Sequence, residues 1–259
     1  MLHSFGGGID VGSCTTKAVL VDSGGRILAD HVIYSGTNFE AASVAAWEEC
    51  LRQADLASSD IASIVSTGYG RRRVHFAGVG RTEISCHGRG CLHYFPGPIT
   101  VVDIGGQDNK IIKLDGNGQR VSFKMNRKCA AGTGAFLEEM ALRLRLPIGE
   151  LDGLARQADG EVALGSYCTV FTATEVLEKI KEGQAVERIV RGLFHSVVKR
   201  ILEMEVLTDT VVLTGGVIEH NPFLADLIRQ HTTCPVVMPP HPQITGALGA
   251  ALYALEQSA

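Results

Sequence analysis

The stretch IDVGSCTTKAVLVD at residues 9–22 decides the fold, because the chain repeats it as VDIGGQDNKIIKLD at residues 102–115. An aspartate, a glycine, a lysine and a final aspartate recur at one offset of 93 residues. In each copy, apolar residues follow the lysine and a glycine-containing turn comes next. Each copy therefore predicts strand, tight loop, strand, turn and strand. Two unrelated β-hairpins are the alternative, and the shared offset argues against them.

The repeated motif has the chemistry of a phosphate loop. Each copy ends its first strand with an aspartate, Asp10 or Asp103, which can hold a hydrated divalent cation. The glycine two positions later lets backbone N–H groups approach a phosphate without a Cβ in the way. Two such loops would bind a polyphosphate and its magnesium from both sides.

The rest of the chain alternates helix and strand patterns, which indicates an α/β protein. Two copies of the hairpin favour two similar lobes around a nucleotide cleft. We expect the first lobe at residues 1–97 plus 245–259 and the second at 98–244, with a boundary near residues 95–98. Helices are expected at 40–53, 131–145, 175–182, 185–205 and 245–255 and from Pro222, and short strands at 61–66, 211–213 and 236–238.

Composition narrows the class of protein. The 259 residues are 45% hydrophobic and 20% charged, and the net charge of −4 gives no basic field for nucleic acid or an anionic membrane. No apolar run approaches the roughly 18 residues of a membrane span. Residues 1–10 lack the basic and apolar regions of a signal peptide. We expect a cytoplasmic protein with no nucleic-acid or membrane partner.

The seven cysteines are irregularly spaced and odd in number, which argues against a disulfide framework. A small buried hydrophobe is the default role for each of them. Cys86 and Cys91 lack the second pair that a metal site would need. Cys14 lies inside the first phosphate loop, where it either packs or acts as an oxidation-sensitive thiol. The basic run at residues 71–73 is a solvated face or a docking patch for an acidic partner.

Several of these motifs resemble the actin/Hsp70/sugar-kinase superfamily, whose fold is an actin-like (ribonuclease H-like) ATPase fold. They are the two phosphate loops, residues 214–216 (TGG) and residues 246–251 (GALGAA). Within the superfamily, residues 125–134 (MNRKCAAGTG) and 168–171 (CTVF) resemble the activators of 2-hydroxyacyl-CoA dehydratases. Those activators are related to the ATPase subunits of benzoyl-CoA reductase and to the reductases of double-cubane cluster proteins.

The resemblance implies a homodimer with one [4Fe-4S] cluster at its interface. It implies ATP-driven transfer of low-potential electrons, received from a ferredoxin or flavodoxin, to a client iron–sulfur enzyme. That client would be a dehydratase, a benzoyl-CoA reductase-like enzyme or a double-cubane protein.

The resemblance also carries roles onto single residues of this sequence. It implies cluster ligation by Cys129 and Cys168, magnesium binding by Asp10 and Asp103, and catalysis by these two aspartates with Gln107. ATP or ADP would be bound by Gly12, Ser13, Cys14, Thr15, Lys17, Gly105, Gly106, Gln107, Gly215 and Gly216.

The cysteine count agrees with a dimer. A [4Fe-4S] cluster takes four thiolates. If Cys129 and Cys168 are the only ligands, one chain supplies two of them and a twofold dimer supplies four. The small residues after Cys129 lead into a predicted helix, whose positive N-terminal end would stabilise the thiolates. The plainer alternatives are a buried helix-start cysteine for Cys129 and a core strand cysteine for Cys168.

Gln107 bears on the reaction class. Phosphoryl transfer depends mainly on positioning and charge neutralisation. A glutamine can orient water but is a poor general base, which favours hydrolysis over transfer to a sugar hydroxyl, although Asp108 could act as a base.

The rival hypotheses are a small-metabolite kinase, a redox or nucleotide sensor, and a zinc ion bridging the dimer. The ordinary alternatives are a surface position for Lys17, a turn-capping role for Asp103 and a structural role for His87.

Overall fold

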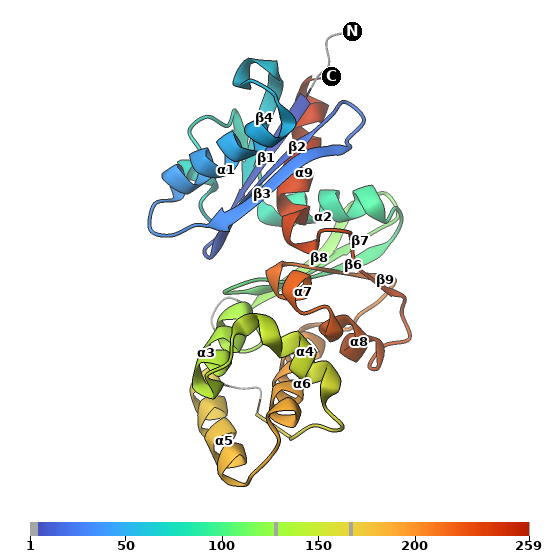
Figure 1. Cartoon of the computed structure of the whole chain (residues 1–259). Helices are drawn as coiled ribbons and strands as arrows, with labels where there is room; N and C mark the ends of the chain where they lie inside the picture. The colour runs from blue at the N-terminus through green and yellow to red at the C-terminus, as the bar shows by residue number, and fades with distance from the viewer. Residues whose placement is uncertain (1–4, 127–128, 166–167, 259) are drawn as a thin grey trace. The chain divides into compact units, whose positions relative to one another are not determined.

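The computed structural model describes residues 5–126, 129–165 and 168–258 (Figure 1). The chain divides into two compact units. The first comprises Met1–Gly97, Leu114–Arg120 and Ile244–Ala259, and the second comprises Pro98–Lys113 and Val121–Gln243. Each of the two five-stranded sheets has its own hydrophobic core.

The first sheet has the strand order β3-β2-β1-β4-β5. Helix α1 covers one of its faces, and helix α9 contacts β1, β2 and β4. Asn38 caps α1 by accepting a hydrogen bond from the backbone N–H of Ala41. The elements are β1 (Phe5–Val11), β2 (Thr15–Val21), β3 (Ile27–Tyr34), α1 (Phe39–Ala54), β4 (Ile61–Thr67), β5 (Val79–Gly80), α2 (Glu83–Tyr94) and α9 (Thr245–Ser258).

The second sheet has the order β10-β9-β6-β7-β8. Its strands β8, β7, β6, β9 and β10 correspond in position to β3, β2, β1, β4 and β5 of the first sheet. Helix α6 is the centre of its core, because its buried residues recur with helical periodicity along one stripe. The elements are β6 (Ile99–Ile104), β7 (Asn109–Leu114), β8 (Arg120–Asn126), α3 (Gly134–Leu144), α4 (Leu151–Gln157), α5 (Thr169–Lys181), α6 (Val186–Met204), β9 (Thr210–Thr214), α7 (Gly216–His220), α8 (Phe223–Arg229) and β10 (Val236–Val237).

The repeat seen in the sequence is present in the backbone hydrogen bonds. The N–H of Gly12 donates to the Thr15 carbonyl at 3.0 Å, and the N–H of Gly105 donates to the Asp108 carbonyl at 2.9 Å. The later turns match as well: the Asp22 N–H donates to Arg26 at 3.0 Å, as the Asp115 N–H does to Gln119. These pairs keep the offset of the sequence match, so the predicted duplication is confirmed and unrelated hairpins are excluded.

Close backbone packing fixes the position of α9 in the first unit. A Cβ added at Gly8 would lie 2.0 Å from the carbonyl oxygen of Ala247. Alternate residues of a strand share a face, so Gly6, Gly8 and Asp10 all point toward α9, and Gly7 points toward Trp47 of α1. The same alternation that lets α9 approach β1 therefore directs the Asp10 carboxylate toward the first residues of α9.

Helix α2 packs on α9 in the same way. A Cβ at Gly90 would lie 2.2 Å from the Thr245 carbonyl oxygen, and one at Gly249 would lie 1.8 Å from the Cys86 carbonyl oxygen. Only glycine allows two helix backbones to come this close. The crossing brings the buried face of α2 beside the N-terminal residues of α9.

Most expected elements lie where the sequence placed them. Helix α5 is an exception, since it begins at Thr169, before the expected residue 175. The helix expected from Ala131 begins three residues later, at Gly134, because Ala131 and Gly132 form a turn. Helices α2, α4 and α7 were not expected, since α4 and α7 are short and α2 carries two glycines within its span.

We predict that Gly8→Ala destabilises the protein by about 1–3 kcal/mol, because the added methyl group meets α9 backbone atoms that cannot move independently. The midpoint of urea unfolding measures the change. Gly78→Ala is the matched control, since its Cβ would meet only the Ile64 carbonyl oxygen at 4.0 Å. Equal midpoints for the two variants would contradict the assigned packing of α9 on β1.

Candidate functional site

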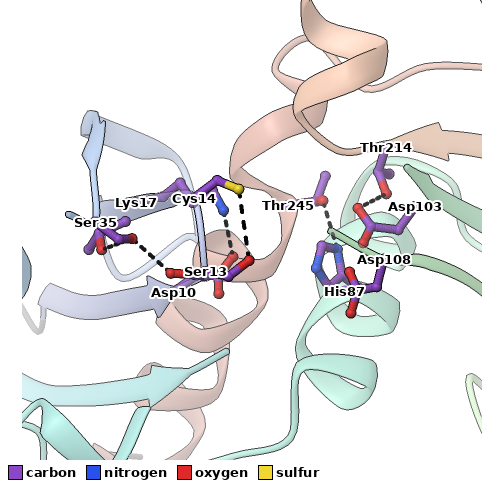
Figure 2. Close-up of polar contacts among 12 residues, drawn as sticks. Asp10, Ser13, Cys14, Lys17, Ser35, His87, Asp103, Asp108, Thr214 and Thr245 are labelled. Carbon is purple, nitrogen blue, oxygen red and sulfur yellow. Dashed lines mark hydrogen bonds and ion pairs between the residues drawn. The ribbon is translucent and has the colours of Figure 1, made fainter. Parts of the chain in front are cut away.

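The first phosphate loop connects β1 to β2. Asp10 lies in β1 and Lys17 in β2, where the strand register pairs them, and their side chains form an ion pair at 3.5 Å (Figure 2). The hydroxyl of Ser35, the residue after β3, donates to the Gly12 carbonyl at 2.7 Å and so holds the loop. Ser13 is exposed at the tip. The loop is thus fixed at both ends and presents its tip to solvent.

The second loop connects β6 to β7 and is more tightly tied. The Lys110 ammonium donates to Asp103 at 3.1 Å and to Asp108 at 2.8 Å. Asp103 also accepts a hydrogen bond from the Thr214 hydroxyl at 3.2 Å (Figure 2). Asp103 is therefore a buried strand residue in a polar network and not a turn cap. Lys17 is likewise largely buried in its ion pair, which excludes a solvated surface lysine.

A Thr-Gly turn closes each loop from the neighbouring strand. Thr67 at the end of β4 is paired in register with Asp10, and Thr214 at the end of β9 is paired with Asp103. The following glycines, Gly68 and Gly215, both have positive φ. An added Cβ would lie 2.4 Å from the Asp10 carboxylate at Gly68 and 2.8 Å from the Asp103 carboxylate at Gly215. Glycine is required at both turns for conformation and for space.

The residues of each loop, taken by itself, suit a magnesium–polyphosphate ligand. Magnesium prefers oxygen ligands and keeps several waters, which suits carboxylates at the edge of a polar loop. The lysine beside each aspartate balances charge, and the glycines open the backbone to phosphate oxygens. Gly106 and Gln107 lie in the second loop, with Gln107 exposed and Gly106 partly exposed. Among the residues that the structure describes, no three His, Cys, Asp or Glu side chains form a further metal-binding group.

The segment after Cys129 is bonded directly to the second phosphate loop. The N–H groups of Gly134 and Ala135, at the start of α3, donate to the carbonyls of Gly105 and Gly106 at 2.9 and 2.8 Å. Nearer the cysteine, the Asn126 side chain donates to the Cys129 carbonyl at 3.2 Å. Cys129 is partly exposed. A displacement of the second loop would therefore be transmitted to the backbone that carries this cysteine.

Cys168 stands at the N-cap of α5 and not in a core strand. Its carbonyl accepts hydrogen bonds from the Thr172 backbone and hydroxyl, at 2.9 and 3.0 Å. The next two apolar residues, Val170 and Phe171, are 71% and 70% exposed. Cys129 and Cys168 thus precede two helices, α3 and α5, that contact each other. Two partly exposed thiols fit half of a cluster's ligand set. The Arg127 and Lys128 of this motif lie outside the described residues.

The other cysteines differ in their environment. Cys50, Cys86 and Cys91 are buried. Burial raises the pKa of the Cys50 and Cys86 thiols to about 12, as expected for thiols inside a core. Cys14 is partly exposed in the first loop, with the Ser13 hydroxyl 3.9 Å from its sulfur.

The basic run at residues 71–73 is a 3-10 turn with Arg72 and Arg73 exposed. Its proposed role in docking stays a prediction.

Two features of the first loop escaped the sequence reasoning. The first is Gly68, the counterpart of Gly215. The Thr-Gly pair at the end of both β4 and β9 is the sequence signal that could have identified it. Gly246 borders Asp10, since its added Cβ would lie 2.9 Å from the carboxylate. That contact could not be read from spacing, because it joins distant parts of the chain.

Comparison with known proteins assigns the chain to a family. The BadF/BadG/BcrA/BcrD ATPase family matches residues 8–254. The "2-hydroxyisocaproyl-CoA dehydratase activator" of Clostridioides difficile is 39% identical over 254 residues, 97% of this chain and 95% of that protein. The solved component A of (R)-2-hydroxyglutaryl-CoA dehydratase from Acidaminococcus fermentans has a TM-score of 0.93 at 35% identity, covering 98% and 99% of the two chains. The solved Clostridium difficile activator with bound ADPNP has a TM-score of 0.90 at 37% identity, covering 99% and 95%.

The duplicated sheets and phosphate loops define an ATPase of the actin-like fold, as the sequence predicted. A ROK family glucokinase from Streptomyces griseus, at a TM-score of 0.62 and 14% identity, shares that fold. Within this class, the chain belongs to the BadF/BadG/BcrA/BcrD ATPase family. None of the helices in the described ranges is long and apolar enough to cross a membrane.

We predict that Lys110→Met costs more stability than Lys17→Met. Removal of Lys110 leaves two carboxylates, Asp103 and Asp108, without their shared cation, at a cost of about 3 kcal/mol. Lys17 forms its ion pair with one carboxylate, that of Asp10, among the described residues, and at a longer distance of 3.5 Å. Urea unfolding of both variants beside the wild type measures the difference, and an equal loss would contradict the tighter second loop.

We predict selective alkylation of the folded, metal-free protein by iodoacetamide at pH 8. Cys14, Cys129, Cys168 and Cys234 should react, because all four are partly exposed. Cys50 and Cys86 should not, because their pKa of about 12 leaves almost no thiolate at that pH. Peptide mass spectrometry locates the adducts, and a urea-unfolded sample in which all seven cysteines react is the control. Fast labelling of Cys86 in the folded protein would contradict its burial.

Proposed function

We propose that the chain is the ATPase component of an electron-transfer system, which delivers single low-potential electrons to a client iron–sulfur enzyme. The names of its relatives support this role, since one activates a 2-hydroxyisocaproyl-CoA dehydratase and another is component A of a 2-hydroxyglutaryl-CoA dehydratase. The client would be a 2-hydroxyacyl-CoA dehydratase, a benzoyl-CoA reductase-like enzyme or a double-cubane protein. A ferredoxin or flavodoxin would be the donor.

ATP would be bound by the two phosphate loops. Asp10 and Asp103 would hold the hydrated magnesium ion, and Lys17 would bind phosphate oxygens. Gln107 would orient the attacking water, since phosphoryl transfer requires mainly positioning and charge balance. Gly215 and Gly216 would contact the adenosine. The solved relative with ADPNP supports nucleotide binding by this fold.

A [4Fe-4S] cluster would be held by Cys129 and Cys168 of two copies of the chain, and when bound it supplies reversible one-electron transfer. The ligand count and the exposed apolar residues beside Cys168 support a homodimer. Val170 and Phe171 leave a hydrophobic surface uncovered in the single chain, as is common where another protein binds.

One observation carries the coupling of ATP to electron delivery: the start of α3 is hydrogen-bonded to the second phosphate loop. A change at that loop on ATP binding or hydrolysis would act on Gly105 and Gly106, and through them on the segment that follows Cys129. Hydrolysis would then reset this contact and make the transfer irreversible.

A small-metabolite kinase is the rival of the same fold. The likeness to a glucokinase shows the fold alone and does not favour this rival. Gln107, immediately after the two glycines of the second loop, is a poor general base, whereas a kinase needs a carboxylate near the acceptor hydroxyl. Asp108 could supply that carboxylate, but it accepts a hydrogen bond from Lys110. The rival predicts a phosphorylated product and no iron.

Anaerobic purification with iron, sulfide and molar-mass determination tests the proposal. We expect roughly four iron and four sulfide atoms per dimer in the wild type. Cys129→Ala and Cys168→Ala should each lose the cluster, because one missing ligand per chain removes two of the four. Cys234→Ala is the control, since this partly exposed thiol contacts the Leu207 carbonyl and lies outside both motifs. A colourless, iron-free wild type after anaerobic reconstitution would refute the cluster and leave an ATP-binding kinase or sensor. Zinc in place of iron would refute electron transfer.

A further inference from the structure

Asn109, the first residue of β7, is a fully buried polar residue to which the proposed function gives no role. Its side-chain amide donates to the Gly132 carbonyl at 2.9 Å, in the segment between Cys129 and α3. Its amide oxygen is buried as well and has no hydrogen-bond partner among the described residues. The polar contact that this buried side chain makes is therefore directed at the cysteine segment.

The first phosphate loop uses the same position differently. Thr16 lies 93 residues before Asn109, at the offset of the repeat. The Thr16 hydroxyl is 2.9 Å from the hydroxyl of Ser35, which in turn donates to the Gly12 carbonyl of the loop. In the first copy, this position therefore supports the closure of its own loop. In the second copy, it connects the loop to the segment that carries Cys129.

Gly132 belongs to a tight turn that begins at Cys129, and we call residues 129–133 the Cys129 turn. Thr133 closes it, because its N–H and its hydroxyl both donate to the Ala130 carbonyl, at 3.0 and 2.6 Å. On the other side of the cysteine, the Asn126 side chain donates to the Cys129 carbonyl at 3.2 Å. Contiguous hydrogen bonds of this kind can carry energetic coupling. A restraint on Gly132 therefore acts on the backbone beside Cys129.

The second phosphate loop reaches this segment by two routes, which substitution can separate. The N–H groups of Gly134 and Ala135 bond to loop carbonyls and hold the start of α3. The Asn109 side chain bonds to the Cys129 turn itself, two residues before Gly134. A substitution at Asn109 removes the second route and leaves the backbone bonds of the first in place.

We propose that Asn109 is a positioning residue that transmits the nucleotide state of the second phosphate loop to the Cys129 turn. A magnesium–nucleotide bound at the loop fixes the start of β7, and the bond from Asn109 to Gly132 then restrains the turn. Cys129 thus becomes less reactive toward solvent reagents when the nucleotide is bound. Without the side-chain bond, the nucleotide still binds but the turn no longer responds. This inference rests on the nucleotide role proposed above for the loop.

Asn109→Leu removes the bond and keeps the branched shape of the side chain. It also removes the unpartnered buried oxygen, which offsets part of the lost hydrogen bond, so we expect the variant to fold. Asn109→Ala is the second variant, in case the leucine methyl groups are not accommodated.

Asn221→Leu is the matched control. Asn221 is also a buried asparagine whose amide oxygen has no partner among the described residues. Its amide donates at 3.0 Å to the carbonyl of Val217, four residues earlier in α7. The same chemistry is thus removed at a site whose hydrogen bond is local.

The experiment measures the iodoacetamide labelling rate of each cysteine in the full-length, cluster-free protein, with and without Mg-ADPNP, by peptide mass spectrometry. In the wild type, the nucleotide should slow labelling of Cys129 about fivefold, the equilibrium factor of one hydrogen bond. This protection should disappear in both Asn109 variants and remain in Asn221→Leu. Cys234 is the internal reference, because it lies outside both cysteine motifs and should not respond to the nucleotide.

Calorimetric titration with Mg-ADPNP, together with the labelling of Cys14 in the first loop, separates this inference from the proposed function. Both should report nucleotide binding equally in the wild type and the variants. No binding to the wild type would refute the nucleotide role of the loops, and the inference with it. Normal binding with Cys129 still protected in the Asn109 variants would overturn the inference alone, as would binding to the wild type without protection. Faster Cys129 labelling by one factor with and without nucleotide would also overturn it, since Asn109 would then only stabilise the turn.

Discussion

The close approach of α9 to β1 is the constraint on which the first unit depends. Gly8 removes the side chain that would separate them, and the two-residue period of the strand then places Asp10 on the same face as Gly8. Gly90 and Gly249 bring α2 onto α9 by the same means. An arrangement needed to pack three backbones together thus delivers three polar side chains to one place, those of Asp10, His87 and Thr245. The polar site follows from how the apolar core is built.

The two loops share one backbone design and differ in how their charges are balanced. Both close with the same Gly N–H bond, and both accept a Thr-Gly turn from the neighbouring strand. In the second loop, Lys110 is shared by two carboxylates and is almost fully buried. In the first, a single longer ion pair joins Lys17 and Asp10. The second loop is thus the more rigid by its contacts, and it is also the one bonded to α3.

The sequence predicted what local pattern determines. The repeat, its two loops and the long amphipathic helix α6 could all be read from spacing and periodicity. Helix α2 could not, because its glycines lower helix propensity and its formation depends on packing against α9, far along the chain. The placement of His87 beside Thr245 was hidden for the same reason, since 158 residues separate them. The alternative of a core strand cysteine at Cys168 came from its apolar neighbours Val170 and Phe171, which instead lie exposed on α5.

The second loop and the cysteine segment form one continuous polar structure. Asn109, the first residue of β7, donates from its side chain to the Gly132 carbonyl at 2.9 Å. Gly132 has a positive φ, and a Cβ added there would lie against the side chain of Arg200. The loop therefore bonds to the cysteine segment at Gly132 and again at Gly134 and Ala135. Anchors on both sides of one turn leave little freedom for the loop to move alone. A nucleotide-dependent change in this loop would have to move the start of α3 or break these bonds, which makes the segment after Cys129 the natural path for any effect of ATP on that cysteine.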